Sequence, residues 1–309
     1  MSDILIENYV QQLNDPETYT DVHAAVIDLV MSVRTISKDQ LMVYLQKAIL
    51  TVLLDSTEDS TIEEELRSSI DSTVKNQYIN INTLHSVLHS INVKLDVFGM
   101  EIAESRDMDT STEILYSFIN KKGTGAIQLS TKYTQNDIQL VKHVVDRIFA
   151  PEHVLQSSVT DTEGNILHRI TYSVPYMSMI KHLRNGPEQL DDEDMPLMTK
   201  LSFDESELFL QDLELYGWLE LYNDCFTLST RGLVELKDFL IKTYGSYPDG
   251  TISTCFGCKD ILTRGCACPN SSCNVRFHKD CKNLFRKSRN TSACPNSDCD
   301  ADIEDFYSF

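Results

Sequence analysis

The chain has 309 residues and 41% of them are apolar, which argues against wholesale disorder and leaves room for two or three small domains. No stretch has the apolar length of a signal peptide or a membrane span, so we expect an intracellular protein without a membrane partner. The formal net charge is −20, and the residues outside 251–309 carry 19 Lys and Arg against 40 Asp and Glu. Such a surface repels nucleic-acid phosphates, so strong direct DNA binding is not expected.

The first 125 residues contain the signals of a small helical domain. Ser37 and Gln40 form a capping box in front of a helix with apolar residues at helical spacing. A second helix over 84–98 has apolar residues at steps of three and four and ends before Gly99. Two apolar segments follow, at 100–102 and 114–119. The order helix, strand, turn, strand predicts a first winged-helix domain over residues 1–125.

Residues 130–248 repeat this pattern more clearly. Capping boxes at Thr134 and Ser202 predict helices that end near Pro151 and Tyr216. Alternating strands are expected around a turn at Asn223-Asp224, followed by a helix capped by Thr230. We also predict a linker over 123–132, before this domain, and a solvated acidic loop over 185–196 within it. We therefore predict a second winged-helix domain over 130–248.

The helix predicted over 203–216 holds the place of a DNA-recognition helix in such a domain. It contains no Lys or Arg and five acidic residues, namely Asp204, Glu205, Glu207, Asp212 and Glu214. This helix cannot supply the usual base-edge donors or phosphate contacts. Packing against another protein is the better interpretation for both winged-helix domains.

Eight of the nine cysteines lie in the last 55 residues, in a pattern of paired metal ligands. The pairs are C-x2-C, C-x4-C, H-x2-C and C-x4-C, enough for two tetrahedral zinc ions with structural roles. With the interleaved pairing of a RING, one zinc is held by Cys255, Cys258, His278 and Cys281, and the other by Cys268, Cys273, Cys294 and Cys299. Cys266 is an alternative to Cys268, but Cys268 gives two matching C-x4-C pairs. Cys266 and Cys225 are therefore predicted to be free thiols.

This ligand order fits two kinds of domain, a variant RING that recruits a ubiquitin-conjugating enzyme and a plant-homeodomain finger that reads histone tails. The second kind usually has an aromatic residue two positions before the seventh ligand, where this chain has Ser292. The aromatic residues within the ligand frame are too few for a methyl-lysine cage. The sequence therefore favours a RING-like domain over 253–300.

A RING docks its conjugating enzyme through apolar residues near the second ligand, in the centre of the domain and after the seventh ligand. The candidates in this chain are Phe256, Gly257, Leu284, Phe285 and Pro295. The basic residue that often follows the last ligand is replaced by Asp300. Ligase activity without a partner is therefore in question.

Four segments together resemble the non-SMC element 1 family, the RING-bearing subunits of the SMC five–six chromosome-maintenance complex. They are INVKLDVFGMEI at 91–102, YTQNDIQLVKHVVDRI at 133–148, the 212–240 segment that begins DLELYGWLELYN, and the C-x4-H-x2-C core. The fold class that follows is mainly α with small β wings: tandem winged-helix domains and then a zinc-binding RING-like domain.

The resemblance also implies partners and a function. It implies a heterotrimer with a MAGE-type subunit and a kleisin subunit, a nuclear, chromosome-associated location, and roles in DNA repair and recombination. It implies a RING-type E3 ubiquitin transferase that depends on its MAGE-type partner, has no catalytic side chain of its own, and leaves most DNA binding to partners. An architectural subunit whose RING serves assembly only is the alternative, and a histone-tail reader ranks last.

Overall fold

The computed structural model describes residues 2–15, 17–71, 77–108, 113–121, 133–151, 157–160, 166–169, 172–186, 200–270 and 272–309. The predicted linker over 123–132 and nearly all of the predicted acidic loop over 185–196 lie outside these ranges. The chain divides into two compact units, residues 1–105 with 113–122, and residues 106–112 with 123–309. Among the described helices, none combines the length and the apolar character needed to cross a bilayer.

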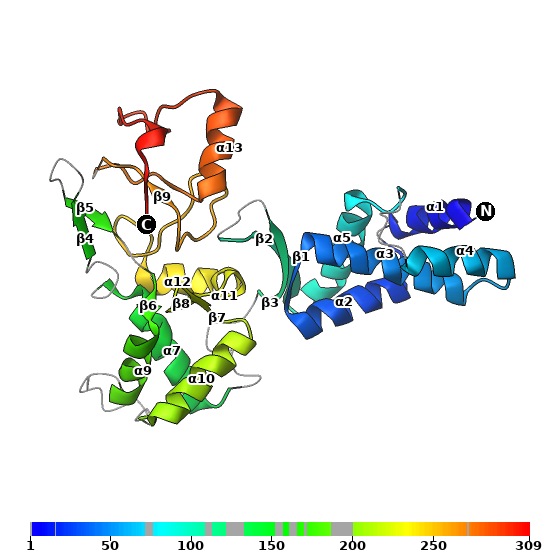
Figure 1. Ribbon diagram of the computed structural model, residues 1–309, viewed down its shortest axis with the longest axis horizontal. Helices are drawn as coiled ribbons and strands as arrows, with labels where there is room; N and C mark the ends of the chain where they lie inside the picture. The colour runs from blue at the N-terminus through cyan, green and yellow to red at the C-terminus, as the bar shows by residue number, and fades with distance from the viewer. Residues whose placement is uncertain are drawn as a thin grey trace. The chain divides into compact units, whose positions relative to one another are not determined.

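The first unit is a helical layer beside a small antiparallel sheet (Figure 1). Its described helices are α1 (Ser2–Leu13), α2 (Asp21–Val33), α3 (Lys38–Asp55), α4 (Ser60–Asp71) and α5 (Ile81–Asp96). Its strands are β1 (Thr35–Ser37), β2 (Met100–Arg106) and β3 (Ile114–Asn120), in the sheet order β1-β3-β2. The core consists of aliphatic side chains together with Tyr116. The helices contribute to it because their apolar residues recur at helical spacing and bury one face of each helix.

The second unit begins with a helical body in which, as in the first unit, a short strand is followed by helices and then by a two-stranded hairpin. Its helices are α7 (Gln135–Phe149), α9 (Tyr176–Asn185), α10 (Phe203–Leu215), α11 (Thr230–Glu235) and α12 (Lys237–Tyr244). Its strands are β4 (Ser157–Thr160), β5 (Ile166–Arg169), β6 (Val174–Pro175), β7 (Leu219–Tyr222) and β8 (Cys225–Leu228). The sheet order β6-β8-β7 matches β1-β3-β2. In each unit, the short strand that precedes the helices pairs with the second strand of the hairpin. The winged-helix assignment of the two units stays a prediction.

The C-terminal segment of the second unit has little regular structure. It contains β9 (Cys266–Ala267), β10 (Arg276–Phe277), α13 (Lys279–Arg289), a 3-10 turn η1 (Ile303–Asp305) and β11 (Tyr307–Ser308). The strands form a sheet in the order β10-β9-β11. The boundaries predicted for three domains, 1–125, 130–248 and 253–300, remain predictions.

Local signals placed most of the predicted elements correctly. The capping boxes at Ser37, Thr134 and Ser202 are present, and each hydroxyl accepts a hydrogen bond from the backbone N–H three residues later. Asn223 and Asp224 both have positive φ and join paired Tyr222 and Cys225, as a two-residue hairpin requires.

The helix predicted to begin with a Thr230 cap differs in detail. Ser229 is the cap, because its Oγ accepts a hydrogen bond from Gly232 N at 3.1 Å and donates one to Gly217 O at 2.5 Å. The helix is also broken at Leu236 into α11 and α12.

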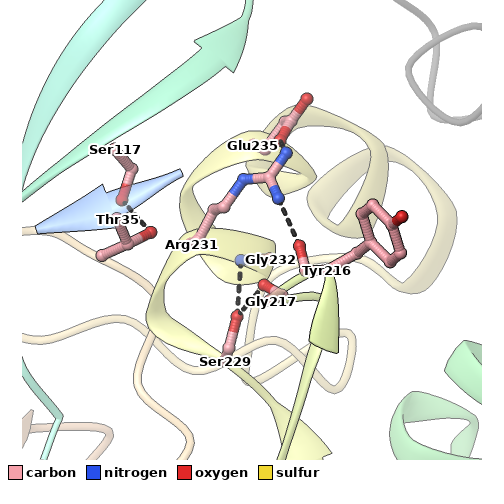
Figure 2. A network of polar contacts seen from close by, with 8 residues as sticks. All are labelled: Thr35, Ser117, Tyr216, Gly217, Ser229, Arg231, Gly232 and Glu235. Atoms are coloured by element: carbon pink, nitrogen blue, oxygen red, sulfur yellow. Dashed lines mark hydrogen bonds and ion pairs between the residues drawn. The ribbon is translucent and has the colours of Figure 1, made fainter. Parts of the chain in front are cut away.

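A buried ion pair within α11 positions Arg231, whose guanidinium also holds the C-terminal end of α10 (Figure 2). The Arg231 guanidinium donates to Glu235 Oε2 at 3.0 Å and to Tyr216 O at 2.5 Å, and it stacks over the Trp218 ring at 4.8 Å. Both charged side chains are less than a tenth exposed. Figure 2 also shows the contact that ties β1 to β3 in the first unit, between Thr35 Oγ1 and Ser117 Oγ at 2.9 Å.

Buried polar contacts join the helical body of the second unit to its C-terminal segment. The Tyr172 hydroxyl donates to Thr251 O at 2.5 Å and lies 2.8 Å from Ser253 Oγ. Arg276 also donates to Ser253 Oγ, and its guanidinium stacks over the Tyr247 ring at 3.8 Å. The body therefore holds the start of the C-terminal segment, which carries the candidate site.

Candidate metal centre

The first ligand group combines one turn with the start of α13. Cys255 and Cys258 lie in a turn closed by a hydrogen bond from Lys259 N to Cys255 O, with Lys259 at positive φ. His278 is the residue before α13 and Cys281 is in its first turn. The four ligand atoms lie within 4.8 Å of one another. The turn at 255–258 and the start of α13 thus bring together the four residues that the interleaved pattern predicts for one zinc.

The second ligand group is formed by two copies of one short motif. Residues 268–273 read CPNSSC and residues 294–299 read CPNSDC, and their four thiols lie within 4.8 Å of one another. Cys268 Sγ is 3.6 Å from Cys299 Sγ, and Cys273 Sγ is 3.7 Å from Cys294 Sγ. In each of these close pairs, one sulfur therefore comes from the first copy of the motif and the other from the second.

The separations match those of tetrahedral zinc. Bonds of about 2.3 Å from zinc to sulfur place two ligating sulfurs about 3.8 Å apart, close to the distances in the second group. In the first group, His278 Nδ1 lies 3.3 Å from Cys258 Sγ and 3.9 Å from Cys281 Sγ. Seven of the eight side chains are buried, and Cys258 is half-buried. Two closed groups of soft ligands fit zinc bound in structural sites.

Electrostatics within the first group favours the ligating form of Cys255. Hydrogen bonds from Cys258 and then from Cys281 hold the pKa of the Cys255 thiol far below its ordinary value. Burial alone would lower the pKa of His278, but hydrogen bonds with Cys255 and Cys281 raise it to about 9. These shifts favour a thiolate at Cys255. Zinc would be held by deprotonated cysteines and a neutral histidine, so its binding would release protons.

The groups that surround the ligands were not predicted from the sequence. The Asn270 amide donates to Cys299 Sγ and the Asn296 amide donates to Cys273 Sγ, each at 3.6 Å. Each asparagine thus supports a sulfur of the opposite motif copy, and the repeated C-P-N-S signature could have pointed to both. Met108, a buried residue of the second unit, places its Sδ 3.3 Å from His278 Nε2. No sequence signal marks Met108, because 170 residues separate it from His278.

The two remaining thiols lie outside both groups. Cys266 is buried in β9, where it pairs with Phe277, and Cys225 is half-buried at the start of β8. Both line a cavity of about 480 Å³ together with residues of the β7–β8 hairpin and of the C-terminal segment. Cys268, and not Cys266, lies in the second ligand group, and the roles of the two thiols stay predictions.

The candidate contacts for a conjugating enzyme differ in exposure. Leu284 on α13 is 61% exposed and Phe256 is 37% exposed, whereas Phe285 and Pro295 are half-buried. The Phe256 and Phe285 rings meet edge to face with centroids 5.9 Å apart. Gly257 is exposed but has no side chain to offer, and a Cβ there would lie 3.2 Å from Cys281 Cβ. Among the five candidates, Phe256 and Leu284 are therefore the ones whose apolar side chains are exposed.

Fold and site together define a class. The chain is a mainly helical protein with small sheets and a C-terminal RING-like domain that carries two four-ligand groups. Residues 255–297 match the family profile described as "RING-like domain". Residues 39–236 match the profile described as "Nse1 non-SMC component of SMC5-6 complex". The chain belongs to this Nse1 family.

Individual relatives agree with this assignment. The "Non-structural maintenance of chromosomes element 1 homolog" of Rattus norvegicus is 24% identical over 222 residues, covering 72% of this chain and 70% of the relative. The Homo sapiens homolog is 23% identical over the same coverage. A chain of the solved "Nse1-Nse3-Nse4 complex" aligns with a TM-score of 0.62 and 17% identity, over 93% of this chain and 98% of that chain. This likeness shows a shared fold.

Proposed function

We propose that this protein is a RING-type E3 ubiquitin transferase subunit of the SMC five–six complex, active with a MAGE-type partner. The observation that supports the proposal best is the pair of interleaved ligand groups beneath an exposed apolar surface at Phe256 and Leu284. Two structural zinc ions would hold that surface in place. Catalysis would consist of positioning a conjugating enzyme and its ubiquitin thioester, because both metal groups are closed and leave no site for an activated water.

The MAGE-type and kleisin subunits are the proposed partners. The fold aligns over nearly its whole length with a chain whose solved structure is titled "Nse1-Nse3-Nse4 complex". The acidic α10, with Leu208 and Leu215 exposed on it, offers a surface suited to a protein partner. We propose a nuclear location and a role in DNA repair and recombination on the same family basis.

Discharge of ubiquitin from a panel of loaded conjugating enzymes tests the proposal, with this chain alone and then with its MAGE-type partner. We expect discharge only with the partner, and its loss in His278→Ala. Leu284→Asp should abolish discharge while zinc content stays unchanged, because the Leu284 side chain is 61% exposed. Asn283→Asp is the matched control: it adds the same charge at the next exposed position and should retain discharge.

An architectural role for the RING is the second candidate. Gly257 lacks a docking side chain and Asp300 stands where a basic residue often follows the last ligand, and both weaken a ligase surface. A complex that holds its zinc, assembles with its partners and discharges no conjugating enzyme would favour this candidate over the first.

A further inference from the structure

Helix α13 has a charge opposite to that of the rest of the protein. Five of its eleven residues are basic and one is acidic, in a chain whose formal net charge is −20. The basic residues are Lys279, Lys282, Arg286, Lys287 and Arg289. In Figure 1, α13 runs along one side of the C-terminal segment. The acidic helix α10, in the same unit, has no basic residue at all.

Four of these cations form one stripe along the helix. Positions 279, 282, 286 and 289 follow the spacing of three, four and three residues that places side chains on a single helical face. With a rise of about 1.5 Å per residue, the stripe is about 15 Å long. Lys287 lies beside it. We call these five residues the basic stripe.

The helix is fixed to the ligand core by a different face. Cys281 is a buried ligand candidate, and the Phe285 ring packs against Phe277 with centroids 5.4 Å apart. At about 100° per residue, Leu284 falls on the opposite side of the helix from the four aligned cations, whereas Lys287 is only one turn away from it. Four cations of the stripe therefore face away from Leu284, and Lys287 lies between the two surfaces.

Most of the basic stripe has no carboxylate partner. Arg286 forms an ion pair with Glu304, whereas no ion pair joins Lys279, Lys282, Lys287 or Arg289 to any residue that the structure describes. Lys279, Lys287 and Arg289 are exposed and Lys282 is half-buried. Four cations are thus available to an anionic partner.

The helix dipole explains only part of this arrangement. Cations in the last turn of a helix are stabilising, which accounts for Arg286, Lys287 and Arg289. Cations in the first turn are unfavourable, yet Lys279 and Lys282 lie there. A ligand that spans the whole length of the helix accounts for both ends.

We propose that the basic stripe contacts the phosphate backbone of nucleic acid without reading its sequence. A protein partner would need apolar or aromatic anchors, and lysine is depleted in such interfaces. The stripe contains no apolar side chain, and Lys and Arg are the side chains that neutralise phosphates. Duplex DNA carries about one charge per 1.7 Å of its axis, so a stripe of about 15 Å faces several phosphates. The acidic remainder of the chain makes this contact weak and confines it to α13.

Fluorescence anisotropy of a labelled duplex, titrated with the full chain at increasing salt, tests the proposal. Four phosphate contacts predict a slope of about −3.6 in the logarithmic plot of affinity against salt. Lys282→Glu with Arg289→Glu should reduce affinity about tenfold or more and flatten the slope by about 2. Lys47→Glu with Lys94→Glu, two exposed lysines of the first unit, changes the net charge equally and should alter affinity little.

Three results would overturn the proposal. The first is an unchanged anisotropy with the wild-type chain at the lowest salt. The second is an equal loss in the two double variants, which would show a bulk charge effect. The third is competition by a poly-glutamate peptide as effective as by unlabelled duplex, which would make the stripe a site for acidic proteins. Zinc content verifies that the stripe variant keeps its ligand groups, and far-UV circular dichroism verifies that the first-unit variant is folded. Ubiquitin discharge should be unaffected by the stripe variant, so this proposal and the ligase proposal can fail separately.

Discussion

The two cores of the second unit are built from different chemistry. Among the described residues, a cluster of 25 buried apolar residues fills the helical body and extends to Ile252 and Ile261, whereas the C-terminal cluster has eleven buried members and seven of them are cysteines. The body is therefore stabilised by the area of apolar surface that it buries. The C-terminal segment buries too little for that and needs its ligand groups to be held together. From this difference we expect metal removal to unfold mainly the C-terminal segment, and truncation of apolar side chains to destabilise mainly the helical body.

Metal removal should have the largest effect. Chelation should unfold residues 253–309, because structural zinc contributes about 10–16 kcal/mol of apparent free energy per site. Hydrogen exchange should show lost protection at α13 and β9, while α7 and α10 stay protected. Equal loss of protection in both parts would mean that the two cores form a single cooperative unit.

Glu235→Ala should have the next largest effect, because it removes the carboxylate that pairs with the buried Arg231 guanidinium. We expect a decrease of about 3–5 kcal/mol in the free energy of unfolding, measured by urea denaturation. Glu63→Ala is the control, since its i,i+4 pair with Arg67 has the same spacing but is exposed to solvent. If both changes lowered the free energy of unfolding by the same small amount, the buried pair would not be essential to the stability of the helical body.

Leu210→Ala tests the apolar core of the body directly. Leu210 is fully buried, and its truncation should lower the free energy of unfolding by about 2–5 kcal/mol while zinc content is unchanged. Leu208→Ala removes the same atoms on the same helix from a side chain that is 65% exposed, so its effect should be small. Loss of zinc from the Leu210 variant would contradict the separation of the two cores.

Asn296→Ala tests the C-terminal core without removing a ligand. It deletes the amide that donates to Cys273 Sγ, and the loss of such an outer-sphere contact lowers metal affinity by about 10- to 100-fold. Competition with a chromogenic chelator measures this change. Asn283→Ala, at an exposed position of α13, should leave affinity unchanged. Equal affinities in the two variants would show that the amide does not stabilise the thiolate.

Tyr172→Phe should have the smallest effect, because it removes one hydroxyl that joins the two parts. The change leaves buried partners at Thr251 and Ser253 and should cost about 1–3 kcal/mol in the free energy of unfolding. Tyr222→Phe, at a 42% exposed ring, is the control. Faster zinc release in the Tyr172 variant would show that the body also stabilises the ligand groups.

The sequence predicted those features that depend on neighbouring residues. Capping boxes at Ser37, Thr134 and Ser202 involve residues three positions apart, so their pattern is legible in the chain. The sequence predicts Thr230 as the cap of α11, whereas the structure has Ser229, because either of two adjacent hydroxyls can cap a helix. Ser229 also donates a hydrogen bond to Gly217 O, a contact that the sequence does not show.

Features that depend on distant residues could not be predicted. The three-residue strand β1 is too short to show a period, and its pairing with β3 spans about 80 residues. In the candidate site, ligand spacing indicated the two groups, whereas Met108 beside His278 and Tyr172 beside Ser253 come together only in the fold. The repeat of C-P-N-S was readable in the chain and points to the asparagines that support the sulfurs.

The close approach of Gly257 to Cys281 limits how this protein could be engineered. A side chain at position 257 would begin 3.2 Å from Cys281 Cβ and 3.7 Å from Cys255 Sγ, so an isoleucine installed there to strengthen enzyme docking would press on the ligand group. Attempts to raise transferase activity should therefore start at Phe256 and Leu284. A stronger ligase made by changing position 257 alone would require the ligand turn to be rebuilt around it.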